Sequence, residues 1–272
     1  MRKIAITLLT MGVAASVAMT ASAAPLFTED FGYATPSGLV GQGGWAAHSG
    51  AGTNPQTVNT PGGLSYAGYP GSGVGALLGP LATSGEDTNH SFTGQSTGAV
   101  YAAVMINVAS SQTTGDYLFH FDDGLITSNI FRARMFVKKD ASTTNYALGI
   151  QFGSNGPPSY TGFVYTPGTT HLCVVKYTFV AGGTANDQVS LIIDPNLASG
   201  CAEPSPNVTH SDATQTDATN LDFVCIRQGT STSAASAQLD GVRIATTWAD
   251  AVGCVVTPTN SSTWGRMKTL YR

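Results

Sequence analysis

Hydrophobic and polar residues alternate along most of the chain after residue 98, and a period of two predicts β-strands. The clearest example is His171–Asp194, in which two alternating runs flank a loop with Gly182-Gly183. A short glycine-containing loop between two such runs is typical of a hairpin turn. We therefore predict that His171–Asp194 forms a β-hairpin, with more of the same structure on both sides of it.

Two further runs show which side chains each strand would bury. In Ala99–Val108, one face is entirely apolar and consists of Val100, Ala102, Val104, Ile106 and Val108. In Ile130–Lys138, alternation predicts an inward face of Phe131, Ala133, Met135 and Val137 and an outward face of Arg132, Arg134, Phe136 and Lys138. The second strand is thus expected to have one face toward water.

Other predicted strands are Leu26–Phe31, Tyr117–Phe121, Tyr146–Phe152, Leu221–Arg227 and Leu239–Trp248. Residues 32–98 are rich in glycine and have weak strand signals near Leu64–Tyr66 and Val74–Leu78, so short irregular strands are expected there. Helical periodicity is almost absent. Short links between the strands favour antiparallel pairing, and the predicted fold class is an all-β, antiparallel β-sandwich.

Residues 1–23 have the pattern of a cleaved signal peptide. Arg2 and Lys3 precede an apolar stretch, and Ala21-Ser22-Ala23 supplies a small-residue cleavage site. The alternative is a membrane anchor, but the apolar stretch is short for a bilayer and contains glycine and threonine. We expect a secreted, extracellular or cell-surface protein with one sandwich domain over residues 24–252 and a tail over residues 253–272.

Charge argues against nucleic acid as a partner. The chain has 12 Lys and Arg, 16 Asp and Glu and a net charge of −4, which becomes −6 once Arg2 and Lys3 are removed. Proteins that bind nucleic acids usually have a basic patch. The low charged fraction of 10% and the 32 glycines are typical of a secreted β protein rich in turns.

Four cysteines remain in the predicted mature chain: Cys173, Cys201, Cys225 and Cys254. An oxidising compartment permits disulfides, and four cysteines allow three pairings. Cys201 and Cys254 lie in loop-like sequence and are the better pair for a surface disulfide. Cys173 and Cys225 lie in apolar strands, where buried free thiols are an alternative.

Five sequence motifs resemble a largely uncharacterised family of bacterial secreted proteins. They are EDFGY after Thr28, Gly43–Trp45 (GGW), Gly62–Tyr69 (GGLSYAGY), Lys176–Pro195 (KYTF…NDQVSLIIDP) and Asp240–Trp248 (DGVRIATTW). The resemblance implies a LamG-like, concanavalin A-like jelly roll and an extracellular setting, and it suggests carbohydrate or surface binding. In related jelly rolls the first and last strands can bind one structural calcium ion, and the matching positions here are Glu29 and Asp240.

Binding of sugars normally uses exposed aromatic rings, which offer flat apolar area with a polar tip. Tyr66 and Tyr69 lie in a loop rich in glycine and proline and are the candidates, with Trp45 as a third. The alternative is that all three belong to the core.

Catalytic motifs are not found. Only three glutamates occur, Glu29, Glu86 and Glu203, and none belongs to the E-x-D-x-E pattern of retaining glycosidases with this fold. No H-E-x-x-H sequence is present, and no G-x-S-x-G forms a nucleophile elbow after a predicted strand. We therefore expect a non-catalytic binding module, with carbohydrate as the ligand. The alternatives are a glycoside hydrolase or lyase with an unrecognised site, and a purely structural protein of the envelope or matrix.

The tail is the one basic spot on an acidic chain. Trp264, Met267 and Tyr271 would share one face of a short helix, and Arg266, Lys268 and Arg272 lie beside them. It is expected either to pack on the sandwich or fray, or to bind a sorting or attachment partner.

Overall fold

The computed structural model describes residues 24–34, 37–59, 63–70, 76–79, 85–124 and 130–254. They lie in one compact unit, Ala23–Val256. The predicted signal peptide and the predicted helix of the tail lie outside the described residues. Within this part of the chain, no helix is long and apolar enough to cross a membrane.

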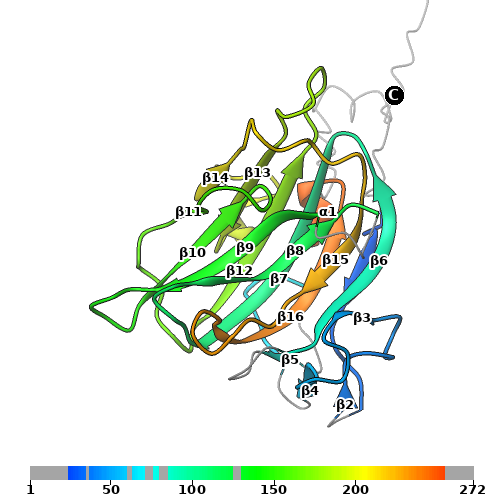
Figure 1. Cartoon of the computed structure of the whole chain (residues 1–272). Coiled ribbons are helices and arrows are strands. Elements are labelled where there is room, and N and C mark those ends of the chain that lie inside the picture. Colours follow the sequence, from blue (N-terminus) through cyan, green and yellow to red (C-terminus); the bar gives the residue numbers. More distant parts are fainter. Residues whose placement is uncertain are drawn as a thin grey trace, which may run out of the picture. The chain divides into compact units, whose positions relative to one another are not determined.

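Two antiparallel sheets pack face to face (Figure 1), so the predicted β-sandwich is confirmed. The nine-stranded sheet has the order β14-β13-β12-β7-β16-β5-β4-β2, and β1 also pairs with β16. Its strands are β1 (Phe27–Glu29), β2 (Ser37–Gly38), β4 (Thr57–Asn59), β5 (Ala76–Gly79), β7 (Ala99–Ser110), β12 (Thr170–Thr178), β13 (Gln188–Ile193), β14 (Val208–His210) and β16 (Ser236–Ala245).

The seven-stranded sheet has the order β11-β10-β9-β8-β15-β6-β3. Its strands are β3 (Ala46–Ser49), β6 (Asp87–Gln95), β8 (Asp116–Asp122), β9 (Phe131–Lys139), β10 (Tyr146–Gln151), β11 (Ser159–Tyr160) and β15 (Leu221–Ile226). The chain passes repeatedly from one sheet to the other, as in jelly rolls. Two short helices complete the described elements: the 3₁₀ helix η1 (Leu197–Ser199) and α1 (Trp248–Val252).

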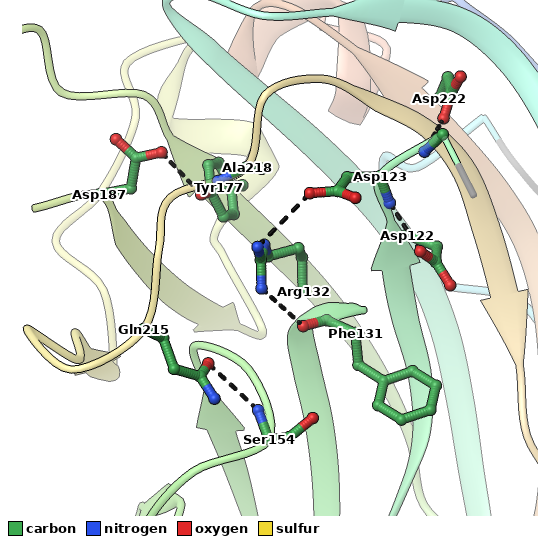
Figure 2. A network of polar contacts seen from close by, with 11 residues as sticks. Asp122, Asp123, Phe131, Arg132, Ser154, Tyr177, Asp187, Gln215, Ala218 and Asp222 are labelled. Carbon is green, nitrogen blue, oxygen red and sulfur yellow. Dashed lines mark hydrogen bonds and ion pairs between the residues drawn. The ribbon is translucent and has the colours of Figure 1, made fainter. Parts of the chain in front are cut away.

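The main core lies between the sheets and is built by alternation. All five apolar residues predicted for one face of β7 are completely buried in it. The predicted hairpin is confirmed as β12 and β13, in register from Cys173 opposite Ile193 to Thr178 opposite Gln188. Its loop end is held by Tyr177, which donates to Asp187 Oδ2 (2.7 Å) and accepts from the backbone N–H of Ala218 (2.9 Å), as Figure 2 shows.

A second core covers the other face of the nine-stranded sheet. Leu172 and Met105 on the sheet pack there against α1, with Trp248 and Val252, and against Leu64. Thr247 caps α1 by accepting from the backbone N–H of Asp250, and Gly253 ends it in the left-handed region. The central strands of this sheet are therefore buried on both faces.

The glycine-rich region contains more strand than its sequence signals indicate. The weak signal near Val74–Leu78 overlaps β5, whereas Leu64–Tyr66 forms no strand. The backbone N–H of Leu64 instead donates to the Asp240 carboxylate, and the Leu64 side chain packs into the second core. A tertiary contact thus takes the place of strand pairing at this segment.

A disulfide joins Cys201 to Cys254, and Cys173 and Cys225 are buried free thiols. The favoured pair is confirmed, and of the possibilities left open for Cys173 and Cys225 the structure has the buried free thiols. The bond links the loop after η1 to the residue that follows the C-cap of α1, across a sequence separation of 53. It therefore ties the second core to the surface loop beside it.

Removal of the disulfide should destabilise the fold. In the chain-entropy account, closing a loop of this length contributes about 4 kcal/mol. We expect the double variant Cys201→Ser, Cys254→Ser to lose most of that free energy of unfolding, measured by chemical denaturation. Reductant should lower the wild-type midpoint toward that of the double variant and leave the double variant unchanged; equal stability of both oxidised proteins would contradict the prediction.

Candidate functional site

The carboxylate of Glu29 lies in the core. β1 and β16 lie side by side, as expected, with Glu29 opposite Val242. Its Oε1 accepts from the backbone N–H of Phe31 (2.6 Å), and its Oε2 accepts from the Tyr33 hydroxyl (2.6 Å) and from Trp45 Nε1 (2.8 Å). Both oxygens thus serve as acceptors that satisfy N–H and O–H groups of the fold.

Asp240 points to the opposite face of the nine-stranded sheet. Its Oδ2 accepts from the N–H of Leu64 (2.7 Å) in the second core, whereas Glu29 shares the main core with Val242. A bulge in β16 between Asp240 and Arg243 produces this change of face. Glu29 and Asp240, which were expected to hold one calcium ion, thus lie on opposite faces of the sheet, and their oxygens accept hydrogen bonds from groups of the fold.

The aromatic residues expected to bind sugar are mostly buried. Trp45 is 2% exposed and Tyr69 is 5% exposed, so neither offers a free ring face. The Tyr69 hydroxyl donates to the carbonyl of Gly241, and Trp45 is bound to Glu29. The expectation of exposed rings is therefore wrong for these two residues, because their polar tips find partners inside the protein.

Tyr66 is half-buried and borders a shallow hollow of about 240 Å³ next to η1. Its hydroxyl donates to the carbonyl of Pro195 (3.0 Å). Burial and the nearby Asp194 carboxylate raise the pKa of Tyr66 to about 12. No charged side chain lines the hollow, so it offers few groups that could recognise a ligand.

The outer face of the seven-stranded sheet, turned away from the main core, combines cations with aromatic rings. It carries a group that we name the basic–aromatic cluster: Tyr117, Arg134, Phe136, Lys138, Tyr160 and Arg227. These residues come from β8, β9 and β11 and from the position directly after β15. Strand pairing brings together residues that are more than a hundred positions apart in the sequence.

Tyr117 is the centre of this cluster. The guanidinium carbon of Arg227 lies 4.4 Å from the centre of its ring, and that of Arg134 lies 4.6 Å away. Phe136 packs against the same ring at 5.5 Å between centroids. Such contacts between cations and rings are favourable and hold both partners in place.

Tyr160 and Lys138 form the outer end of the cluster. Lys138 Nζ lies 5.5 Å from the centre of the Tyr160 ring, and both residues are half-buried. The Tyr160 ring lies directly over Gly149, where a Cβ atom would come within 2.6 Å of it. Glycine at this position therefore lets the ring lie flat against the sheet.

The cations of the cluster differ in how their charge is balanced. Arg227 forms a salt bridge with Asp116 (2.8 Å). Arg134 donates to neutral oxygens, the carbonyl of Gly153 (2.7 Å) and the amide oxygen of Gln151. Burial lowers the pKa of Arg134. Among the described residues, no salt bridge includes Arg134 or Lys138, so this face has positive charge available for an anion.

A bulge in β9 decides which residues reach the outer face. Ala133 has φ +49°, and at this point two residues of β9, Ala133 and Arg134, lie opposite the single residue His120 of β8. Ala133, Met135 and Val137 are in the main core, as predicted. Phe131 is not: its ring packs against His120 on the outer face, at 4.9 Å between centroids. The prediction that Phe131 points inward is wrong because the bulge changes the alternation.

His120 lies in the middle of this outer face. It is buried, and its Nδ1 lies 3.0 Å from the carbonyl oxygen of Phe121. Burial lowers the pKa of His120 to about 3, so the imidazole is neutral at neutral pH. Its ring centre lies 5.6 Å from that of Tyr117.

The basic–aromatic cluster was only partly visible in the sequence. The outward series Arg134, Phe136 and Lys138 follows from alternation in one strand. Tyr117, Tyr160 and Arg227 lie in three other segments, and no local signal connects them with that strand. Only the pairing of β8 with β9 and β15, and of β10 with β9 and β11, brings these residues together.

Comparisons with known proteins find similarity of structure alone. No model of a known protein family matches the chain, and no curated protein matches it. Alginate lyase Aly36B, in a mutant form in complex with alginate tetrasaccharide, has a TM-score of 0.48 and 13% identity, covering 82% of this chain and 97% of that protein.

Two further solved structures are similar at the same level. Endo-β-1,4-glucuronan lyase from the fungus Trichoderma reesei has a TM-score of 0.48 and 10% identity, covering 84% of this chain and 98% of that one. The CBM2 module of Lactobacillus casei BL23 phage J-1 evolved Dit has a TM-score of 0.44 and 10% identity, and the match covers 81% of this chain and 94% of that module. At these scores the likenesses decide nothing about function, and the fold of this chain rests on its own strand pairing.

Substitution of Glu29 tests whether its role is structural. Glu29→Gln replaces one carboxylate oxygen, which accepts hydrogen bonds, by an amide NH₂ group, which donates them. At least one of the three donors that bind Glu29 then loses its acceptor, and a buried unsatisfied donor costs about 1–3 kcal/mol. We expect a loss of that size in the free energy of unfolding, equal with calcium and with chelator. Asp30→Asn, at the exposed neighbouring carboxylate, is the control and should change stability by less than about 0.5 kcal/mol. Stabilisation by calcium in the wild type that is absent in Glu29→Gln would instead support the calcium prediction.

Proposed function

We propose that this protein binds an acidic polysaccharide across the outer face of its seven-stranded sheet and acts as a non-catalytic, secreted or cell-surface module. The observation that carries the proposal is the basic–aromatic cluster, in which Arg134 and Lys138 have no carboxylate partner among the described residues and lie beside aromatic rings.

The chemistry of the cluster suits sugars that carry carboxylates. A guanidinium or ammonium group binds a carboxylate through charge-assisted hydrogen bonds. The half-buried ring of Tyr160, which lies 6.2 Å from the buried ring of Phe136 between centroids, offers apolar area for the C–H face of a sugar ring. A uronate residue combines both features, since it has an apolar ring face and a carboxylate at its edge.

The net charge of the chain makes this face selective. The protein as a whole has a net charge of −4 and so repels anions in general. Only a local excess of positive charge opposes that repulsion, and a polymer gains by contacting several cations at once. An acidic polysaccharide is therefore favoured over a neutral glycan at this face.

Lys138 and Lys139 are neighbours on β9 and make a matched pair for a test. Their side chains point to opposite faces, and Lys139 instead borders a hollow beside Ser110 and Thr144. With polyuronate as the ligand, we expect Lys138→Ala to weaken binding about three- to tenfold, since one such charge pair contributes about 1 kcal/mol. Lys139→Ala should leave the affinity unchanged.

Calorimetry measures the affinity of the wild type and of each variant for polyuronate. The same measurement with a neutral glucan of similar length compares the two kinds of ligand. Added salt should weaken binding of the polyuronate, because the attraction is electrostatic. Tyr66→Ala tests the earlier candidate and is expected to have no effect. No binding of polyuronate by the wild type, or equal losses in Lys138→Ala and Lys139→Ala, would reject the proposal and leave the purely structural alternative.

A β-elimination that cleaves uronate chains is the second candidate, and one observation favours it. Neutral His120 and Tyr117 lie beside the Arg134 guanidinium. This reaction removes the proton next to the sugar carboxylate, with a cation on the carboxylate, a base for the proton and an acid for the leaving oxygen. The low exposure of His120 weighs against it, so binding without cleavage stays the first proposal.

Incubation with polyuronate separates the two candidates. Cleavage by elimination creates an unsaturated sugar with strong ultraviolet absorbance, and binding alone does not. We expect no rise in absorbance with the wild type. A rise that Tyr117→Phe abolishes, without loss of affinity, would replace the binding proposal by the lyase.

A further inference from the structure

Three potential metal ligands meet on the outer face of the seven-stranded sheet, in a place that the proposed glycan function does not use. They are His48 on β3, Asp122 on β8 and Cys225 on β15, and their ligand atoms all lie within 4.8 Å of one another. Across the part of the chain that the structure describes, no other set of three His, Cys, Asp or Glu residues is this close.

Strand order explains how they meet. Cys225 lies opposite His120 on β8, so Asp122, two residues farther along, points to the same face. β6 separates β15 from β3, and the register of β3 shifts between Ala47 and Ser49. His48 lies at this irregularity, and its ring reaches to 6.0 Å from the ring of His120.

Two buried atoms of the group lack any hydrogen-bond partner. Asp122 is completely buried; its Oδ1 accepts from the N–H of Asp123 (2.8 Å), and its Oδ2 has no partner. His48 Nδ1 is also buried without a partner. An ionised carboxylate in such a place costs several kcal/mol unless a cation compensates it.

Arg132 does not form an ion pair with Asp122. Arg132 forms its salt bridge with Asp123 (3.4 Å), and in Figure 2 the Asp122 carboxylate points away from Arg132. Asp222 accepts from the N–H of Gly124 (2.8 Å) and adds another acid nearby. The surroundings thus add negative charge near a carboxylate oxygen that already lacks a partner.

We propose that His48, Asp122 and Cys225 bind a divalent transition-metal ion of the zinc type. Imidazole, thiolate and carboxylate are the ligands that zinc prefers, at about 2.0–2.3 Å in tetrahedral sites. Ligand atoms in such sites lie about 3–4 Å apart, so the group needs to contract by about 1 Å. Hard cations such as calcium prefer oxygen ligands alone and do not fit this set.

Binding would link three strands that lie far apart in the sequence. The ion takes the thiolate of Cys225, so the thiol proton is released when the ion binds. Asp122 Oδ2 and one ring nitrogen of His48 gain a partner. Three protein ligands leave the fourth position for water. The expected consequence is a fold that is more stable with the metal than without it.

Cobalt is the most informative probe, because it reports a sulfur ligand directly. The full-length protein, freed of metal by a chelator, is titrated with Co²⁺. We expect one equivalent to give a near-ultraviolet thiolate-to-cobalt band and the visible bands of a tetrahedral site, and one equivalent of Zn²⁺ to remove both. Absence of the thiolate band in the wild type would overturn the proposal.

The two buried free cysteines provide matched variants. Cys225→Ala should lose the thiolate band, and Cys173→Ala, in the nine-stranded sheet, should keep it; the reverse result would reject the assignment. A stability measurement covers the case in which a variant folds poorly. Zn²⁺ should raise the unfolding midpoint of the wild type and of Cys173→Ala, and not that of Asp122→Asn. Far-ultraviolet circular dichroism of Asp122→Asn checks that this variant is folded. A midpoint of the wild type that is indifferent to Zn²⁺ would likewise overturn the proposal.

Discussion

Burial of both faces of the nine-stranded sheet is the constraint on which the rest of the structure depends. The main core covers one face, and α1 with the segment around Leu64 and Tyr69 covers the other. The disulfide between Cys201 and Cys254 holds this second layer in place. The outer face of the seven-stranded sheet therefore carries the half-buried cations and the half-buried Tyr160 ring that a ligand can reach.

The same constraint explains why buried acids differ in role. Asp240 is needed because the covering segment brings a backbone N–H against the sheet, and Glu29 is needed because Tyr33 and Trp45 bring donors into the core. Their carboxylates replace the water that those donors lose on folding. Asp122 is equally buried, but one of its oxygens has no donor. Identical side-chain chemistry thus has a structural role in two places and is open to a ligand in the third.

The outer face of the seven-stranded sheet separates two kinds of chemistry. Toward β9 and β11 it offers cations and rings, which suit a large anionic polymer at the surface. Toward β3 and β15 it offers the compact, buried group of His48, Asp122 and Cys225, which suits a single ion. His120 lies between them, in contact with Phe131 on the one side and near Tyr117 on the other. An ion bound at the second place would fix strands that also position the first.

Alternation determined the sandwich, the β12–β13 hairpin and the core face of β7, because each depends on neighbours within one segment. The same local sequence favoured the Cys201–Cys254 pair but left the state of Cys173 and Cys225 open. Sequence periodicity did not foresee the bulge at Ala133 or the covering layer over Asp240, since both depend on contacts between distant segments. For the same reason it misplaced the candidate site: Glu29, Trp45 and Tyr69 have the residue types of a binding site, but partners from other strands bury them. Packing between distant segments decides which polar side chains remain available to bind a ligand, so only the tertiary structure can identify them.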